Sequence, residues 1–416
     1  MTGISYEDFV DRDYEPRDDD LVCEFAIDPA EGLDMDDAAG RVASESSNGT
    51  WATLDVDDRV TDLSATAFAI GDGEISVAYP EALFEAGNMP QVLSCIAGNI
   101  MGMKAVDTIR LEDAHWPAGL SRSFLGPQYG SAVTHELLDA EDRPALATVP
   151  KPKVGLSPEQ HAQVGYEAWR GGIDLLKDDE NLTNQSFNRF EERVKRSFEL
   201  RDRAQAETGE RKDYLVNITA DTEEMKRRAD LVDEQGGNFV MVDVVTAGWA
   251  SVQSVREYTA DLGLAIHAHR AMHAAFDRVE DHGVSMRVLA QVARLVGVDH
   301  IHTGTANLGK LENEDTVGIN DWLAGDLHGM TDVLPVASGG LHPGTIDPLL
   351  DRLGTDIMVQ AGGGVHGHPD GSAAGARAMR QAIDAYQAGI DPETYADDHP
   401  PELATALEKW GTHSPR

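Results

Sequence analysis

The hydrophobic pattern of the chain changes near residue 126. From there on, short apolar runs with strand character recur, and segments of helix length and composition separate them. The strand-like runs are residues 145–149, 173–176, 214–218, 239–244, 264–268, 298–301, 333–337 and 356–359. Eight β–α units in roughly 270 residues predict a TIM barrel. A doubly wound open sheet is the less favoured alternative, because no GxGxxG motif follows the first strand.

The segment before residue 126 lacks this rhythm and mixes short strands with helices. Its strand-like runs are residues 21–27, 65–70 and 74–79, and its helix-like runs are residues 34–46 and 89–97. The predicted organisation is therefore α/β overall. A smaller α+β domain spans residues 1–125, and a catalytic barrel domain with a short helical tail spans residues 126–416.

Polar side chains follow several of the barrel strands at their carboxyl ends, where barrel enzymes carry out their chemistry. In residues 171–180, GGIDLLKDDE, an apolar run ends in Lys177 and three acids. Alternation along the strand places Lys177 and Asp179 on one side, and Glu180 can join them after a turn. One amine and two carboxylates would then share a pocket, and carboxylate oxygens suit a hard divalent ion such as Mg²⁺. A single acidic run is more often a solvated surface, so this interpretation depends on the other loops.

Five further loops carry chemistry-bearing residues to the same rim. They hold Lys151 and Lys153; His267, His269 and Arg270; His300, His302 and Lys310; Ser338, Gly339 and Gly340; and Gly362, Gly363 and Gly364. The two glycine loops resemble the phosphate site that barrels often build after strands seven and eight, although each alone is more typical of a tight turn. One phosphate site at the glycine loops and a second near Arg270 and His302 would fit a bisphosphorylated substrate. A metal between them would stabilise an enediolate.

Composition narrows the possible partners. The 34 basic and 73 acidic residues give a net charge of -39, which disfavours nucleic acid and anionic membranes. A hydrophobic content of 41% indicates a folded chain whose acids coat the surface, as suits a halophile-like cytosol. The N-terminus has no signal-peptide features and no apolar run has the length of a membrane span, so a cytoplasmic protein is expected.

Taken together, these motifs resemble the large chain of ribulose-1,5-bisphosphate carboxylase/oxygenase. The matching segments are ESSxGTW from Glu45, GN at 98–99, KPK at 151–153, GG-D-KDDE at 171–180, HxHRAMH at 267–273, HIHxGT from His300, GKLE around Lys310, SGG and GGG. The resemblance covers about residues 20–390. Because plant-type terminal extensions are absent, the chain looks like the archaeal form III group, which has no small subunit.

The resemblance implies carboxylation, with side oxygenation by O₂, of D-ribulose 1,5-bisphosphate to two 3-phosphoglycerates. It implies that Lys177 takes up an activator CO₂ as a carbamate, binds one Mg²⁺ with Asp179 and Glu180, and removes the C3 proton. Lys151 would be the proton donor at C2, His269 would take part in proton transfer, and Lys310 would lie on a closing loop. Implied substrate-binding residues are Lys153, Arg270, His302, Ser338, Gly339, Gly340, Gln360, Gly362, Gly363, Glu45, Thr50, Trp51 and Asn99.

The resemblance also bears on assembly and pathway. Glu45, Thr50, Trp51 and Asn99 would come from a neighbouring subunit, so a homodimer or a ring of dimers with shared active sites is expected. The form III likeness suggests a role in degrading the ribose of AMP. Two departures from the plant pattern, Pro150 before KPK and a loop one residue longer before Lys310, leave loop closure and CO₂/O₂ selectivity open.

Two other functions fit parts of the pattern. A carboxylase-like enolase or isomerase would act on a phosphorylated sugar or methionine-salvage intermediate without fixing CO₂. Such proteins usually keep the metal residues but lose some of the others, whereas Lys151, His302 and Lys310 all remain here. A non-catalytic acidic scaffold would give these loops no reason to retain lysines.

Overall fold

The computed structural model describes residues 2–308 and 315–412. The chain forms two compact units. The first contains Met1–Leu125, Met272–Val296 and Leu327–Met330, and the second contains Gly126–Ala271, Gly297–Asp326 and Thr331–Arg416. A segment that follows the fifth barrel strand in the chain thus belongs to the first unit.

The first unit is built on a five-stranded sheet in the order β12-β6-β2-β5-β4. Its central strand β2 (Asp20–Pro29) pairs antiparallel with β5 (Glu74–Pro80) and β6 (Val106–His115). Alternate residues of β2, among them Leu21, Cys23 and Phe25, are buried, as expected for a sheet with one covered face. The other strands are β1 (Thr2–Ile4), β3 (Leu54–Val56), β4 (Thr66–Phe68) and β12 (Gly283–Val284).

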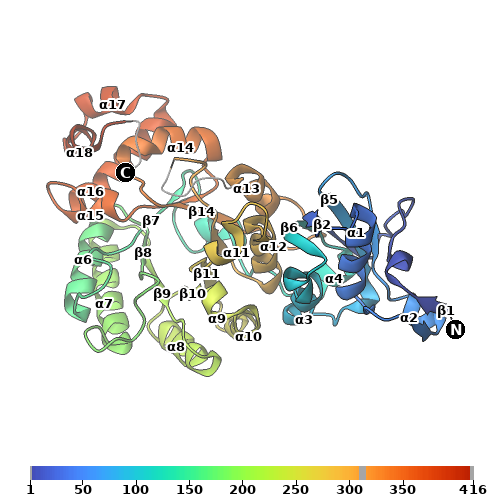
Figure 1. Cartoon of the computed structure of the whole chain (residues 1–416). Helices are drawn as coiled ribbons and strands as arrows, with labels where there is room; N and C mark the ends of the chain where they lie inside the picture. Colours follow the sequence, from blue (N-terminus) through green and yellow to red (C-terminus); the bar gives the residue numbers. More distant parts are fainter. Residues whose placement is uncertain (1, 309–314, 413–416) are drawn as a thin grey trace. The chain divides into compact units, whose positions relative to one another are not determined.

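Helices of the first unit pack beside this sheet (Figure 1). α1 (Met35–Glu45) begins where the Asp34 side chain accepts a hydrogen bond from the Asp37 N–H, and α12 (Met286–Val296) packs against β6. The remaining helical elements are η1 (Tyr6–Phe9), α2 (Asp58–Thr61), η2 (Glu81–Leu83), α3 (Met89–Ile96), η3 (Asn99–Gly102), α4 (Ala118–Arg122) and α11 (Ala274–Asp277).

The second unit is a closed barrel of eight parallel strands, in the order β7-β8-β9-β10-β11-β13-β14-β15. The predicted fold, an α+β domain followed by a TIM barrel, is confirmed. Each of the eight predicted strands is present, with ends shifted by one or two residues. They are β7 (Ala145–Thr148), β8 (Leu175–Lys177), β9 (Asp213–Asn217), β10 (Phe239–Asp243), β11 (Ala265–His269), β13 (His300–His302), β14 (Leu334–Ser338) and β15 (Met358–Gln360).

The barrel interior is filled with apolar side chains, so it is a packed core with chemistry at one end. Leu175, Leu215, Met241 and Val336 from four strands belong to one buried cluster. A segment before β7 joins this cluster through Val133 and its neighbours. That segment is short, with η4 (Gly130–Ala132) and α5 (Val133–Glu136).

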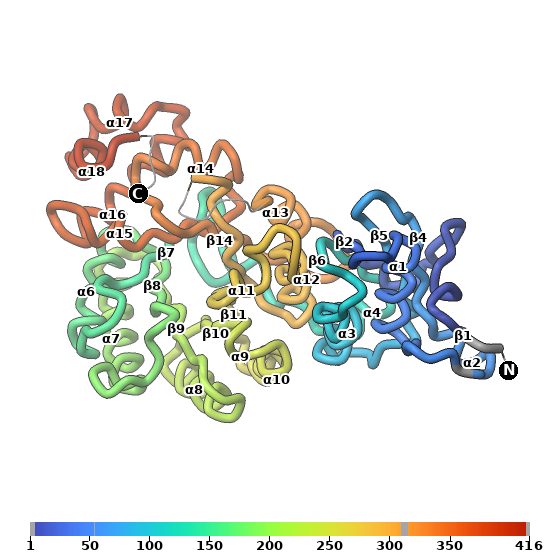
Figure 2. The backbone as a smooth tube through the Cα atoms, in the orientation of Figure 1, coloured from blue at the N-terminus to red at the C-terminus, as the bar shows by residue number. Residues whose placement is uncertain are grey.

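Helices surround the barrel strands in Figure 1. They are α6 (Pro158–Arg170), α7 (Phe190–Thr208), α8 (Thr222–Glu234), α9 (Val244–Ala247), α10 (Trp249–Ala260), α13 (Thr316–Ala324), η5 (Pro343–Thr345), α14 (Ile346–Leu353), α15 (Gly363–His366) and α16 (Ser372–Ala388). The chain ends in α17 (Pro392–Asp398) and α18 (Glu402–Trp410), which fold back onto α16 (Figure 2). Within the described part of the chain, no helix combines the length and apolarity needed to span a bilayer.

Candidate active site

A cavity of about 570 Å³ opens at the carboxyl ends of the barrel strands. Its volume is in the range of small-molecule sites. Its walls come from the loops after β7, β8, β14 and β15, together with the end of α18. Ten of the residues proposed from the sequence line it: Lys151, Lys153, Asp179, Glu180, Ser338, Gly339, Gly340, Gln360, Gly362 and Gly363.

Lys177 is the last residue of β8 and is completely buried. Its Nζ donates a hydrogen bond to the Asp178 carbonyl oxygen at 2.8 Å. Burial lowers the pKa of Lys177, and the negative charges of Glu180, Asp243 and Asp179 only partly offset that effect. The environment therefore favours the neutral amine, which is the nucleophilic form of lysine.

The two carboxylates beyond Lys177 are held by a neighbouring asparagine. Asn181 donates from its backbone N–H and its side chain to Asp179 Oδ1, and its Nδ2 also reaches Glu180 Oε1 at 3.2 Å. The other oxygen of Asp179 lies 3.3 Å from Lys151 Nζ. Burial raises the pKa of Asp179, but these hydrogen bonds and the two lysine charges lower it below its ordinary value. Asp179 is therefore ionised at neutral pH.

Asp178, between these ligand candidates, points away from the cavity as strand alternation requires. It is fully buried, and Arg193 of α7 lies 3.1 Å from its Oδ2 while His161 of α6 lies 3.2 Å from its Oδ1. Burial alone would raise the pKa of Asp178, but Arg193 and the hydrogen bonds lower it to about 2. This ion pair ties the strand end to the helices behind it and so positions Lys177 and Asp179.

Four histidines of β11 and β13 form a contiguous group in the barrel. His267 Nε2 lies 2.9 Å from His302 Nε2, and His302 Nδ1 lies 2.7 Å from Ser338 Oγ at the cavity wall. His269 lies between two carboxylates, with Nδ1 3.2 Å from Asp243 and Nε2 3.7 Å from Glu180. Burial lowers the pKa of His267, His269 and His302, which favours the neutral forms of these rings.

The glycine loops bring backbone close to the cavity. Gly339 and Gly340 have φ values of +110° and +81°, a region that favours glycine, so the turn after β14 depends on them. A Cβ on Gly362 would lie 2.8 Å from Lys151 Cε, which shows how closely the loop after β15 approaches this lysine. Gln360 is buried at the cavity wall, and its Oε1 has no hydrogen-bond partner in the described part of the chain.

The remaining predicted residues fall into three groups. Arg270 follows β11 directly, is buried, and lies near enough to His302 to lower its pKa, although burial has the larger effect. Lys310 lies outside the described residues. Glu45, Thr50, Trp51 and Asn99 belong to the first unit, at the end of α1, in the loop after it and in η3.

Sequence reasoning missed several residues that complete the cavity. Lys409 and Trp410 at the end of α18 line it, as do Leu341 and His342. Asp243, which contacts His269, was also missed. The scarcity of lysine offered one usable signal, because Lys409 is among only nine lysines in the chain.

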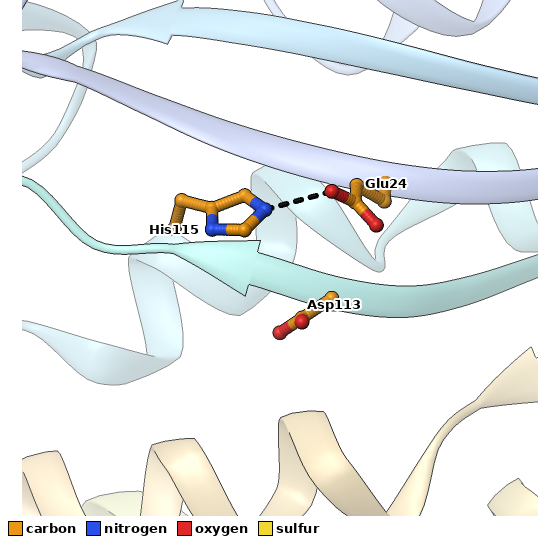
Figure 3. A group of neighbouring side chains, drawn as sticks. All are labelled: Glu24, Asp113 and His115. Atoms are coloured by element: carbon orange, nitrogen blue, oxygen red, sulfur yellow. Dashed lines mark hydrogen bonds and ion pairs between the residues drawn. The ribbon is translucent and has the colours of Figure 1, made fainter. Parts of the chain in front are cut away.

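A different cluster of metal-binding residue types lies on the sheet of the first unit (Figure 3). Glu24 of β2 and Asp113 and His115 of β6 place potential ligand atoms within 4.8 Å of one another. His115 and Glu24 already pair at 2.7 Å, and the oxygens of Asp113 accept from Arg287 Nε and Gln291 Nε2. These contacts account for the cluster as an exposed ion-pair network.

The residues at the end of β8 fit a magnesium site. Asp179 and Glu180 supply two hard oxygen ligands beside the cavity, and Lys177 is a buried amine with a lowered pKa. A carbamate on that amine would add a third anionic oxygen donor.

The fold and the site define a class of protein, the TIM-barrel proteins with a lysine and acidic residues at the barrel mouth. Family models narrow that class. The model for the ribulose bisphosphate carboxylase large chain, catalytic domain, matches residues 130–410, and the model for its N-terminal domain matches residues 8–120. The chain therefore belongs to the large-chain family of ribulose bisphosphate carboxylase, and the enzyme class expected from its motifs is confirmed.

Similar proteins come from archaea, which confirms the expected archaeal character. The ribulose bisphosphate carboxylase of Pyrococcus abyssi is 52% identical over 99% of this chain and 98% of that protein. The octameric enzyme of Pyrococcus horikoshii, solved with sulfate, has a TM-score of 0.95 at 50% identity and covers 99% of this chain and 98% of its own. The dimeric Hyperthermus butylicus enzyme has a TM-score of 0.92 at 48% identity, covering 98% and 99%.

Proposed function

We propose that this chain carboxylates D-ribulose 1,5-bisphosphate to two molecules of 3-phosphoglycerate, with oxygenation by O₂ as a side reaction. The observation that carries the proposal is the single cavity at the barrel mouth. It brings three lysines, two carboxylates and two glycine loops together around one space. The family membership and the names of the archaeal relatives support the same reaction.

Lys177, Asp179 and Glu180 are proposed to hold one Mg²⁺ once Lys177 has taken up CO₂ as a carbamate. When bound by these residues, the metal would stabilise negative charge on adjacent substrate oxygens. Lys177, in its carbamylated form, removes the C3 proton of the substrate. Its fully buried position keeps water away from that base, and the Asp178–Arg193 pair fixes its place in the strand.

Lys151 is proposed to donate the proton at C2. Its Nζ is 3.3 Å from Asp179, so a charged ammonium group stands beside the proposed metal residues. Lys153 supports it at the cavity rim. His269, between Asp243 and Glu180, is suited to moving protons and holding substrate hydroxyls.

The two phosphates are proposed to bind at opposite ends of the site. One lies against Gly339, Gly340, Gly362 and Gly363, where backbone can approach an anion closely. The other lies near Arg270 and His302, with Ser338 and Gln360 contacting substrate oxygens between them. The unpartnered Oε1 of the buried Gln360 supports such a contact, because a buried polar atom without a partner is costly.

Assembly completes the proposed site. Glu45, Thr50, Trp51 and Asn99 would be supplied by a second subunit, and Lys310 would close over the substrate. The side chains of Glu45, Trp51 and Asn99 are exposed in the single chain, with Trp51 84% exposed, as a contribution to another subunit requires. A homodimer without a small subunit is the proposed minimum, and relatives described as dimeric and octameric support it.

The decisive experiment incubates the purified protein with Mg²⁺, ribulose 1,5-bisphosphate and labelled CO₂. We expect label in the carboxyl group of 3-phosphoglycerate, and we expect Lys177→Ala to abolish it. Lys195→Ala is the matched control, because Lys195 is an exposed lysine on α7 of the same unit. Enolisation without fixed label would reject the proposal in favour of a carboxylase-like enolase.

We further propose that the enzyme consumes ribulose bisphosphate derived from the ribose of AMP, in a salt-rich cytosol. The archaeal family likeness supports the first part and the charge of -39 supports the second. Isotope tracing from ribose-labelled AMP in the host should yield labelled 3-phosphoglycerate. Labelled product derived only from ribulose 5-phosphate would contradict the pathway while leaving the reaction itself intact.

A further inference from the structure

The cavity at the barrel mouth has a wall that none of the proposed roles uses. Lys409 and Trp410, at the end of α18, line it together with the two glycine loops. These two residues come from the C-terminal end of the described chain, more than thirty positions beyond the last glycine of the site.

The end of α18 packs against residues that follow β14 and β15. The Trp410 ring stacks on His342 with centroids 5.7 Å apart and meets the edge of His368 at 6.4 Å. The next residue approaches so closely that a Cβ on Gly344 would lie 1.9 Å from the Gly411 carbonyl oxygen. Trp410 is therefore packed into the wall of the cavity, and Lys409 precedes it in α18.

The ammonium group of Lys409 lies beside the glycine loop that follows β15. Its Nζ donates to the Gly367 carbonyl oxygen at 2.5 Å and lies 5.3 Å from the centre of the Trp410 ring. Both partners are neutral, so neither cancels the positive charge. Lys151, by contrast, is paired with the Asp179 carboxylate. Lys409 thus brings to the cavity a positive charge that its two neighbours leave uncompensated.

A lysine in this position is suited to an anion. Its side chain carries three donors on a flexible stem, so one N–H can stay on Gly367 while another turns to a ligand. The phosphate proposed to bind at the glycine loops carries about two negative charges and must enter a cavity that also holds Asp179 and Glu180. A further cation would offset part of their repulsion.

We propose that Lys409 is a substrate-binding residue that contributes its charge to the phosphate held by the loops around Gly339 and Gly362, and that Trp410 positions it. The inference rests on the proposed function, because the phosphate belongs to the proposed substrate. It assigns the C-terminal helix a part in substrate affinity, in addition to packing on the barrel.

The test compares Lys409→Met, Lys409→Arg and the control Lys195→Met, which removes the same charge from an exposed site on α7. For Lys409→Met we expect KM for ribulose bisphosphate to rise roughly three- to tenfold with kcat changed less than about twofold. Lys409→Arg should stay within about twofold of the parent because it keeps the charge, and Lys195→Met should match the parent.

Binding of inorganic phosphate tests the role of Lys409 independently of the proposed carboxylase reaction. Titration calorimetry should show that inorganic phosphate binds to the parent protein. Binding to Lys409→Met should be weaker by roughly the same three- to tenfold factor as expected for KM. If the parent fixes no labelled CO₂, the proposed function fails, while the phosphate titration still decides whether Lys409 binds an anion. An unchanged KM and phosphate affinity in Lys409→Met would overturn the inference, including when the variant melts earlier. Equal losses in Lys409→Arg and Lys409→Met would overturn it too, since they would indicate packing.

Discussion

His267 and His302 share a single hydrogen bond in the barrel core, with their Nε2 atoms 2.9 Å apart. Only one of these nitrogens can carry the bridging proton when both rings are neutral. His302 Nδ1 is engaged with Ser338 Oγ at 2.7 Å, so the protonation of three side chains is linked. The ring that donates in the His267–His302 bond therefore decides whether the Ser338 hydroxyl donates to His302 or is free to donate to a substrate.

We predict that His267→Phe raises KM for ribulose bisphosphate and lowers kcat/KM by roughly tenfold, since it leaves a buried nitrogen of His302 unpaired. His300→Phe is the control, because His300 is equally buried and neither of its ring nitrogens has a hydrogen-bond partner in the described part of the chain. Steady-state kinetics with both purified variants provide the measurement. Equal effects of the two substitutions would show that core packing, and not the hydrogen bond, is responsible.

Two adjacent glycines should respond differently to the same added methyl group. In Gly362→Ala the new Cβ would press on Lys151 Cε from 2.8 Å, whereas at Gly363 no atom lies within 4 Å. We expect Gly362→Ala to lower kcat by about tenfold because it displaces the proposed proton donor from its place beside Asp179. Gly363→Ala should leave kcat nearly unchanged and act only on KM. A normal kcat in Gly362→Ala would argue against the role of Lys151.

Asp174, immediately before β8, is a buried carboxylate that binds Arg143 through two contacts of 2.7 Å and accepts from the Leu146 N–H. Burial would raise the pKa of Asp174, but Arg143 and Arg380 lower it below its ordinary value. We predict that Arg143→Met lowers the free energy of unfolding by about 3 kcal/mol at pH 7, because a buried charge loses its main partner.

The pH dependence of this pair follows from the lowered pKa. Its stabilisation is complete above the unfolded pKa of an aspartate, near 4, and is lost as the pH falls through the folded value. The difference in the free energy of unfolding between the parent and Asp174→Asn should therefore be largest at neutral pH. It should become smaller on acidification below about pH 4. Urea unfolding at several pH values measures it. A gap that widened in acid would contradict the lowered pKa.

The proposed sharing of active sites between two subunits predicts recovery of activity in mixed oligomers. Glu45→Gln and Lys177→Ala should each be inactive alone, because each spoils every site. When the two variants are co-expressed, half of the dimers are mixed and one of their two sites is intact. Activity should then return to about a quarter of the parental value. Absence of recovery in verified mixed dimers would place Glu45 outside the partner's site.

Much of the fold was predictable from the sequence because it depends on local patterns. All eight barrel strands were predicted, since buried parallel strands are short apolar runs that flanking helices and turns delimit. The strand β6 was missed, because Val106–His115 carries charged residues on its exposed face and bends at a bulge opposite Glu24 and Phe25. It was also not predictable from the sequence that α12 belongs to the first unit. That assignment depends on contacts with β6, which is far from α12 in the sequence.

By itself, the sequence determined the barrel strands, the family and the loops that carry chemistry, because periodicity and short motifs are properties of neighbouring residues. Only the tertiary structure decided that Asp178 turns to Arg193, that His267 joins His302, and that Lys409 reaches the glycine loops. Each of these contacts depends on barrel closure and helix packing, which bring together residues up to some tens of positions apart, and no local pattern encodes which of them will meet.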